Sequence, residues 1–380
     1  MTCEHFGSCG GCVYLDIPYD KELAIKLQDL KKCLGEYGGL LETIIPAPKP
    51  ANYRNKMEFA FGDDKKCGSL SLGIRKKRSM YEVAQPTNCV LVPAYFTEII
   101  KTVQEYFLDS GEKFYHRKKH TGTLRHLTIR RGEFTGETLV MLSTTSHISA
   151  PLEPLARLLC RIPANIVGIL HATNDSVADV VKNDNIKILH GRDYYKELLL
   201  GHSFDVAINA FFQTNSTGAE ALYSIVKDFA KNAASNDMAL DLYCGTGTIT
   251  QIIAPLFKKI AGIEIIPEAI EKARQTAASN CEFFEGDAAK LLEQNYFMQN
   301  KPNLIVLDPP RDGLNPKIIP HIHKLQPEKI IYVSCKPTSL ARDMPLLQNY
   351  GYNPVAIKAL DMFPRTPHVE TIVLLQWGDS

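Results

Sequence analysis

Apolar residues along the second half of the chain recur in short runs at regular intervals. From about Phe204 onward, runs of four to six mostly apolar residues alternate with stretches of helical periodicity. The runs that we expect to form strands are 239–243, 261–264, 282–287, 304–308, 330–333 and 372–375. Strands that alternate with helices are typical of a parallel sheet, so the pattern predicts an α/β domain.

The first half of the chain has a weaker pattern. Between about Tyr53 and Ala207 we expect short strands such as 57–61 and 139–142, with helices over 95–108 and 152–160. This mixture predicts a smaller α+β domain. Before it, Leu23, Leu27, Leu30 and Leu34 recur at three- and four-residue spacing, which predicts a helix within residues 17–37.

Four acids are in phase with the predicted strands. Asp241, Glu264, Asp287 and Asp308 are spaced by 23, 23 and 21 residues, the length of one strand and one returning helix. We therefore expect them to line up at the carboxyl edge of the sheet, where ligands bind in such folds. The loop Cys244-Gly245-Thr246-Gly247 lacks the third glycine of a dinucleotide fingerprint. An acid before the loop favours S-adenosylmethionine over a pyrophosphate.

A thiol follows one of the predicted strands. Cys335 comes just after the apolar run 330–333, and Asp308-Pro309-Pro310-Arg311 follows the preceding strand without the aromatic residue typical of amine methylation. Methylation of uracil at C5 needs a thiolate that adds to C6 and a base that removes the C5 proton. Cys335 is the candidate nucleophile and Glu370 the candidate base, although an isolated cysteine more often only fills space.

Three cysteines crowd the N-terminus. Cys3, Cys9 and Cys12 lie among Gly7, Gly10 and Gly11. Thiolates this close together are typical metal ligands, and Cys89 in a turn-like segment is the candidate for a fourth ligand. We expect a [4Fe-4S] cluster, with zinc or unligated cysteines as the alternatives. The remaining cysteines are expected to be structural: Cys33, Cys67, Cys160, Cys244 and Cys281.

One stretch of the chain is strongly basic, although the chain as a whole is almost neutral. Residues 113–131 carry seven Lys or Arg and three His but no acid, whereas the net charge is +1. Together with 75–78 and the interleaved Tyr115, this stretch predicts an RNA-binding surface. The residues that we expect to contact RNA there are Arg117, Lys118, Lys119, Arg130 and Arg131.

The N-terminus has neither a basic nor an apolar leader region, and the chain has no apolar run of about 18 residues. We therefore expect a cytoplasmic protein with no membrane association. Ten cysteines in a reducing compartment favour metal and thiol chemistry over disulfides.

The chain resembles, over nearly its whole length, the iron-sulfur-containing RNA uracil-C5 methyltransferases that act on 23S rRNA and tRNA. The matching motifs, in order, are Cys3-x5-Cys9-x2-Cys12, Tyr53-Arg54-Asn55-Lys56, Phe211-Phe212-Gln213-Thr214-Asn215, 241–245, 308–311, 334–337, 340–343, and 361–364 through 368–370.

The resemblance implies a role for several residues. Cys335 would be the nucleophile, Glu370 the base, Phe211 a platform near the target base, and the four cysteines cluster ligands. The donor contacts that the resemblance implies are Gln213, Tyr243, Glu264 and Asp308. Three further candidate donor contacts come from the phased acids and the glycine loop: Asp241, Gly245 and Asp287.

The resemblance also implies a domain arrangement. Residues 204–380 would form a Rossmann-like class I S-adenosylmethionine-dependent methyltransferase domain, on which residues 13–47 pack. Residues 1–12 and 48–203 would form the smaller α+β domain, which carries the cluster and binds RNA. The motifs begin at residue 3. We therefore expect the short form without an OB-like barrel, a 23S rRNA target and a monomer that needs no protein partner.

Three alternatives stay open. The first is a tRNA uridine-54 C5 methyltransferase. The second is a cytosine-C5 RNA methyltransferase, although such enzymes carry a Pro-Cys where this chain has Asp308-Pro309-Pro310-Arg311. The third is a non-catalytic RNA-binding protein, which would be expected to have lost Cys335 or Glu370.

Overall fold

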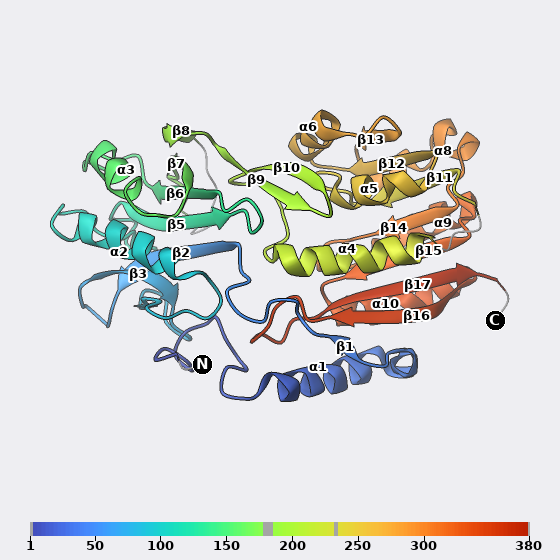
Figure 1. The fold of residues 1–380 in the computed structure, drawn as a ribbon, viewed down its shortest axis with the longest axis horizontal. Coiled ribbons are helices and arrows are strands. Elements are labelled where there is room, and N and C mark those ends of the chain that lie inside the picture. The colour runs from blue at the N-terminus through green and yellow to red at the C-terminus, as the bar shows by residue number, and fades with distance from the viewer. Residues whose placement is uncertain (1–2, 178–184, 232–234, 379–380) are drawn as a thin grey trace. The chain divides into compact units, whose positions relative to one another are not determined.

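The computed structural model describes residues 3–177, 185–231 and 235–378. The chain divides into two compact units, and both are discontinuous in sequence. Residues 1–16 and 49–217 form unit 1, and residues 17–48 and 218–380 form unit 2. Figure 1 follows the chain through the labelled helices and strands.

Unit 1 is built on a mostly antiparallel sheet. In the described part of the chain this sheet has seven strands in the order β4-β3-β2-β5-β6-β7-β8. The strands are β2 (Lys56–Asp63), β3 (Leu70–Arg75), β4 (Val83–Ala84), β5 (Leu124–Arg131), β6 (Thr138–Thr144), β7 (Ile166–Thr173) and β8 (Asn185–Gly191). The helices are α2 (Ala94–Leu108) and α3 (Glu153–Leu159). The apolar face of α2 supplies Phe96, Ile99, Ile100, Val103 and Phe107 to the core, all with no exposed surface.

The boundary between the units differs from the predicted one at residue 204. Strands β9 (Tyr194–Leu199) and β10 (His202–Ala207) form a hairpin, so residues 204–207 stay with β9. The buried Arg130 of β5 then donates to the carbonyls of Ala207, Ile208 and Ala210 at 2.7–2.9 Å. Backbone pairing and a buried guanidinium therefore hold residues 204–210 in unit 1, which extends to Thr217.

Unit 2 is built on a larger sheet, with eight strands in the described residues. Its order is β1-β16-β17-β15-β14-β11-β12-β13. The strands are β1 (Ile44–Ile45), β11 (Met238–Leu242), β12 (Lys259–Glu264), β13 (Cys281–Glu285), β14 (Leu304–Leu307), β15 (Lys329–Ser334), β16 (Tyr352–Leu360) and β17 (Glu370–Trp377). Strands β11 to β15 are mutually parallel, and β17 is antiparallel to both β15 and β16.

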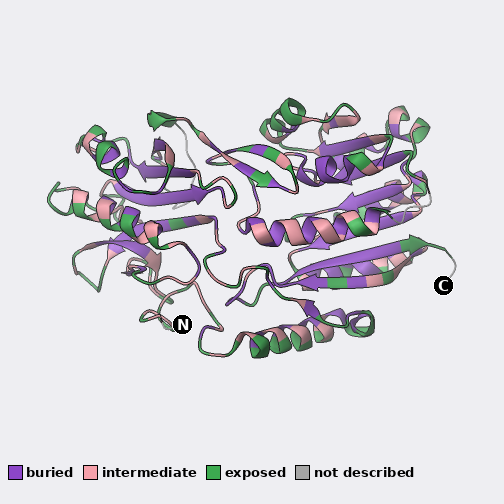
Figure 2. Cartoon of the chain, in the orientation of Figure 1, coloured by how far each residue is buried: buried purple, intermediate pink, exposed green. Residues whose placement is uncertain are grey.

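Helices cover the faces of this sheet. Leucines of α1 (Tyr19–Leu34) and α10 (Pro337–Gln348) share one core with the strands, and Ile322 and Leu325 of α9 (Ile319–Leu325) join it. The other helices are α4 (Ser216–Lys231), α5 (Thr248–Ile253), α6 (Pro267–Thr276), α7 (Ala288–Leu291) and α8 (Asn295–Gln299), with short 3-10 turns at Gly35–Leu40, Ala254–Leu256 and Pro316–Ile318. Figure 2 shows the central strands buried and the outer faces of the helices exposed.

The strand order reverses beside β11. From β11 the chain adds β12 and β13 on one side and then returns to place β14 on the other side. Ligands of open α/β sheets bind at the carboxyl ends of the strands beside such a reversal. Residues that follow β11 and β14 are therefore positioned for a ligand, and these include Tyr243 and Asp308.

Candidate active site at the carboxyl edge of the large sheet

Cys335 and Glu370 are brought together by antiparallel strands. Ser334 at the end of β15 pairs with Thr371 of β17. Cys335 is the residue after Ser334 and Glu370 the residue before Thr371, so the register sets them opposite each other. The carboxylate of Glu370 raises the pKa of the Cys335 thiol, which agrees with this proximity. Two residues 35 positions apart thus meet at one sheet edge.

Two more charged groups act on this pair. Burial is the main cause of the raised Cys335 pKa, and Glu370 and Asp308 add to it. Arg311 opposes them, both through its charge and through a side-chain hydrogen bond to the thiol. A cation beside a cysteine favours the thiolate, which is the nucleophilic form.

The carboxyl groups at this edge hold protons unusually tightly. Burial raises the pKa of Glu370 to about 8, with a further rise from Asp308 and a decrease from Arg311. Burial also raises the pKa of Asp308 to about 7. Such values lie close to neutral pH, where a carboxyl group can both accept and release a proton.

Asp241 is buried without full hydrogen bonding. Its Oδ2 accepts a hydrogen bond from Thr250 Oγ1 at 2.6 Å, but no described residue donates to Oδ1. Burial raises its pKa to about 7, although Thr250 opposes this, while Asp308 and Glu264 raise it further. A buried carboxylate oxygen with no partner is suited to a ligand that brings its own donor or positive charge.

Glu264 and Asp287 are different, because backbone amides already satisfy them. Glu264 accepts from the amides of Gly245 at 3.1 Å, Ile265 at 2.7 Å and Ile266 at 3.0 Å. Asp287 caps α7 by accepting from the amide of Lys290 at 3.1 Å. Both acids therefore shape their loops, and each carboxylate keeps lone pairs that a ligand hydroxyl or amine could use.

The glycine loop leaves open space at the sheet edge. Gly245 and Gly247 have φ values of 54° and 76°, which glycine adopts most easily. A Cβ on Gly247 would lie 2.6 Å from the ring of Phe283, whereas one on Gly245 would meet no atom within 4 Å. The backbone at Gly245 is thus accessible to a ligand. Tyr243, just before the loop, is half-buried, and burial raises its pKa to about 12.

Arg311 is the functional candidate that sequence reasoning missed. The sequence feature that could have indicated a role for Arg311 is its position directly after Asp308-Pro309-Pro310, at the sheet edge that carries Cys335. Its backbone carbonyl accepts from Ser339 Oγ at 2.7 Å. The buried Asp343 of α10 also accepts from the amide of Leu314 and from Tyr332 Oη, at 2.7 and 2.8 Å. These bonds fix the loop that carries Arg311 against α10.

The residues predicted to contact RNA fall into two groups. Lys118 and Lys119 are exposed, Arg117 is half-buried, and Phe211 exposes 77% of its surface. Arg130 and Arg131 are buried instead, which contradicts their predicted contact with RNA. The guanidinium of Arg130 is bound to three backbone carbonyls, and that of Arg131 pairs with Glu133.

The four predicted metal ligands line one pocket in unit 1. Cys3, Cys9, Cys12 and Cys89 share it with apolar residues that include Phe6, Leu15 and Leu91. Burial raises the pKa of Cys9 and Cys89, and the neighbouring cysteines add to the rise. Within the described ranges, however, no three or more Cys, His, Asp or Glu side chains are arranged to hold a metal ion. The cluster therefore remains a prediction.

Comparison with known proteins identifies the family. An uncharacterized RNA methyltransferase of Clostridium tetani is 45% identical over the whole of this chain and 84% of its own length. Another, from Caldanaerobacter subterraneus, is 42% identical over 98% of this chain and 84% of its own length. The chain belongs to this RNA methyltransferase family.

A domain family and a solved structure agree with this result. The family described as "Methyltransferase domain" matches residues 233–354 of the RNA methyltransferase. The crystal structure of the tRNA (uracil-54, C5)-methyltransferase of Pyrococcus abyssi, in complex with S-adenosyl-L-homocysteine, is 27% identical. It superposes with a TM-score of 0.78 and covers 97% of this chain and 86% of its own. The predicted α/β methyltransferase fold is thus confirmed. No helix among the described residues is long and apolar enough to cross a membrane.

Proposed function

We propose that this RNA methyltransferase transfers a methyl group from S-adenosylmethionine to C5 of a uridine, through a covalent bond between Cys335 and C6 of the base. The observation that carries the proposal is the position of Cys335 and Glu370, each one residue beyond the Ser334–Thr371 pair of β15 and β17, beside Arg311. This chemistry requires a thiol nucleophile and a base, and a nearby cation favours the thiolate form of the nucleophile.

The donor would bind along the edge from β11 to β14. Asp241 Oδ1, buried and without a donor from any described residue, suits the ammonium group of the methionine part. The open backbone at Gly245 would receive the same part, Glu264 the ribose hydroxyls, and Asp287 the adenine amine. Tyr243 and Asp308 lie at the strand reversal. Gln213 stays a prediction from the resemblance.

The residues of the chain would act in sequence. The Cys335 thiolate, favoured by Arg311, forms a bond to C6, and the electron pair displaced to C5 makes that carbon nucleophilic. S-adenosylmethionine would supply an electrophilic methyl group to C5, and its sulfonium sulfur would leave as the neutral thioether of S-adenosylhomocysteine. Glu370 then removes the C5 proton, the C5–C6 double bond re-forms, and Cys335 leaves as a thiolate.

The target RNA has two candidates. The resemblance favours 23S rRNA, and the structural likeness to a tRNA (uracil-54, C5)-methyltransferase favours tRNA. The exposed Lys118 and Lys119 would contact phosphates, and Phe211, 77% exposed, would stack on a base of the RNA. Replacing Lys118 and Lys119 with Gln should weaken RNA binding severalfold, whereas the same change at the exposed pair Lys65 and Lys66 should not.

The product distinguishes the proposed reaction from its rivals. Purified protein would be incubated with labelled S-adenosylmethionine and unmodified 23S rRNA or tRNA transcripts, and the RNA digested to nucleosides. We expect 5-methyluridine in one of the two RNAs. Formation of 5-methylcytidine would favour the cytosine-C5 alternative, and RNA binding without any methylation would favour a non-catalytic protein.

For the cysteine pocket we propose a [4Fe-4S] cluster held by Cys3, Cys9, Cys12 and Cys89. Four thiols that line one pocket match the ligand set of such a cluster, and the apolar walls would shield it from water. Metal binding would also deprotonate thiols whose pKa is raised by burial.

The cluster can be tested by metal and sulfide content. Anaerobically purified protein should be brown and contain about four iron and four sulfide per chain. Cys89→Ser should lose most of both, whereas Cys160→Ser, at an exposed cysteine outside the pocket, should lose neither. Colourless protein with about one zinc and no sulfide would replace the cluster with a zinc site.

A further inference from the structure

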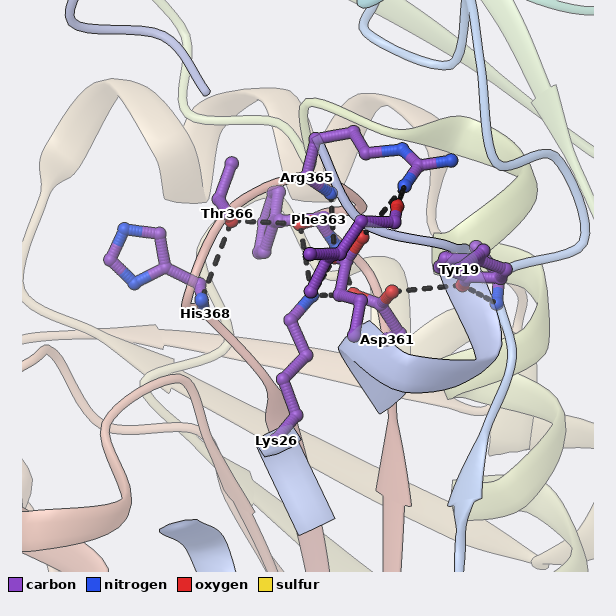
Figure 3. A network of polar contacts seen from close by, with 10 residues as sticks. Tyr19, Lys26, Asp361, Phe363, Arg365, Thr366 and His368 are labelled. Atoms are coloured by element: carbon purple, nitrogen blue, oxygen red, sulfur yellow. Dashed lines mark hydrogen bonds and ion pairs between the residues drawn. The ribbon is translucent and has the colours of Figure 1, made fainter. Parts of the chain in front are cut away.

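A buried network of charges binds the segment that precedes Glu370. It joins three residues of α1, Tyr19, Glu22 and Lys26, to Asp361 and Arg365 in the connection between β16 and β17 (Figure 3). The four charged residues are between 0% and 7% exposed. Two acids and two bases therefore neutralise one another inside unit 2.

Lys26 and Tyr19 converge on Asp361. Lys26 Nζ lies 2.8 Å from Asp361 Oδ1 and 2.7 Å from Glu22 Oε1. Tyr19 Oη donates to Asp361 Oδ2 at 2.8 Å and accepts from the amide of Ala47 at 2.9 Å. Both oxygens of Asp361 are thus bound by groups on α1.

Glu22 holds the other end of the connection. Its Oε1 accepts from the amide of Arg365 at 2.7 Å, and its Oε2 lies 3.3 Å from the Arg365 guanidinium. Arg365 has a φ of 70°, a conformation that residues other than glycine rarely adopt without support. The network therefore holds the backbone in a bend that the sequence alone would not favour.

This connection leads directly to the candidate base. Asp361 follows Leu360, and Leu360 pairs with Glu370 in the sheet. Inside the connection, Thr366 Oγ1 donates to the carbonyl of Phe363 at 2.7 Å, and the amide of His368 lies 3.4 Å from Thr366 Oγ1. Lys26 Nζ itself lies 3.4 Å from the same Phe363 carbonyl. A chain of contacts thus runs from α1 to within two residues of Glu370.

We propose that this network positions Glu370 for removal of the C5 proton, with Lys26 and Asp361 as its positioning residues. The inference rests on the proposed function. Proton removal needs the carboxylate within hydrogen-bonding distance of C5, whereas addition and methyl transfer do not use Glu370. Loosening the connection should therefore slow the last step more than the earlier ones.

The variants are chosen to keep the fold. Lys26→Met would leave two buried carboxylates facing Arg365 alone, and this change could unfold unit 2. The double variant Lys26→Met with Asp361→Asn removes one cation and one anion together and keeps the Glu22 and Arg365 pair. Tyr19→Phe removes the hydrogen bond to Asp361 and the one that Tyr19 Oη accepts from the amide of Ala47, and it leaves all four charges in place. Lys21→Met, at an exposed neighbour of Glu22 on α1, is the matched control.

Besides the turnover rate, two measurements separate positioning from folding. The first is the dissociation constant for S-adenosylhomocysteine, which reports on the donor site. The second is the fraction of protein that migrates with RNA on denaturing gels after reaction, which reports on the covalent intermediate. Glu370→Gln is run beside the variants as the reference for a lost base.

We expect the double variant to bind S-adenosylhomocysteine within about twofold of wild type, to turn over at least tenfold more slowly, and to accumulate the covalent adduct. Tyr19→Phe should show a smaller change in the same direction, and Lys21→Met none. Wild-type turnover in the double variant, or slow turnover without adduct, would overturn the positioning role if Glu370→Gln does accumulate adduct. If Glu370→Gln shows no adduct either, the proposed function itself fails.

Discussion

Unit 2 contains two groups of buried acids with opposite surroundings. In the network beneath the β16–β17 connection, Glu22 and Asp361 are matched by Lys26 and Arg365. At the sheet edge, Asp241, Asp308 and Glu370 have pKa values raised to about 7 or 8. No described residue donates to Asp241 Oδ1, and Arg311 is the cation that acts on Glu370.

The difference indicates which acids stabilise the fold and which are available for chemistry. Removing one partner of a matched buried ion pair leaves an uncompensated buried charge and costs about 3–5 kcal/mol of stability. A buried carboxyl group without a matching cation costs stability whenever it is ionised, and such groups concentrate at functional sites. The edge acids are therefore the candidates for binding and proton transfer, and the network acids for positioning.

The largest expected effect follows from removing the thiol that the edge acids surround. Cys335→Ala should lower methyl transfer to below about one per cent of wild type, because no bond to C6 can form. Binding of S-adenosylhomocysteine, measured by calorimetry, should be unchanged, since the thiol acts on the base. Substantial residual turnover would mean that the edge group is not arranged around a nucleophile.

Opposite changes in stability should distinguish the two groups of acids. Asp361→Asn removes one partner of a buried pair and should destabilise unit 2 by about 3–5 kcal/mol. Asp241→Asn should be neutral or stabilising by about 1–2 kcal/mol at pH 8. Thermal unfolding of both variants measures the contrast, and a loss of stability in both would remove the distinction.

The effect of Asp241→Asn should depend on pH. The folded-state pKa of Asp241 is about 7, above its ordinary value of 3.8, so the folded protein binds the proton more tightly than the unfolded chain. Stability should therefore fall as pH rises from about 4 to about 7. The advantage of Asn should be absent near pH 4 and complete above about pH 8.

Donor binding should weaken in the same Asp241→Asn variant. Loss of a charge-assisted hydrogen bond to the donor ammonium costs about 1.5–3 kcal/mol, which corresponds to a roughly 10- to 150-fold weaker affinity. Titration with S-adenosylhomocysteine measures it. Asp361→Asn is the control, because its carboxylate lies outside the donor edge, and an equal loss there would indicate a general effect of unfolding.

The smallest expected effect concerns the cation beside the edge acids. In wild type, the turnover rate should rise with pH through about 8, where Glu370 becomes a carboxylate that can remove the C5 proton. Arg311 lowers the pKa of both Glu370 and Cys335. Arg311→Met should therefore shift this rise to higher pH and reduce the rate at pH 7 by roughly tenfold. Arg311→Lys should retain much of the wild-type profile, and an unchanged profile in Arg311→Met would exclude this role.

Much of unit 2 could be predicted because its strands are continuous apolar runs. Each predicted run corresponds to a strand from β11 to β15 or to β17. Of the phased acids, Asp241 is the next-to-last residue of β11, Glu264 ends β12, and Asp287 and Asp308 follow β13 and β14. Strand β16 was not predicted, because Pro354 and Lys358 interrupt its apolar pattern. Without β16, periodicity cannot indicate that β17 runs antiparallel to β15 and brings Glu370 opposite Cys335.

The charged residues were harder to predict. Charge density alone cannot distinguish an exposed Lys118 from a buried Arg130, which binds backbone carbonyls of a distant segment. The spacing of Glu22 and Lys26 indicates a pair on one helix, but their partner Asp361 lies 335 positions from Lys26. Side chains whose partners come from remote segments need the fold before their roles can be assigned.

The most direct test of the central claim is the chemical fate of Glu370→Gln after one reaction with RNA. With addition and methyl transfer intact but the base removed, the protein should stay bonded to RNA through Cys335. Mass spectrometry of the digested adduct should find the Cys335 peptide joined to a uridine that has gained one methyl group. A Glu370→Gln protein that turns over normally, or forms no adduct while it still binds RNA and S-adenosylhomocysteine, would contradict the account.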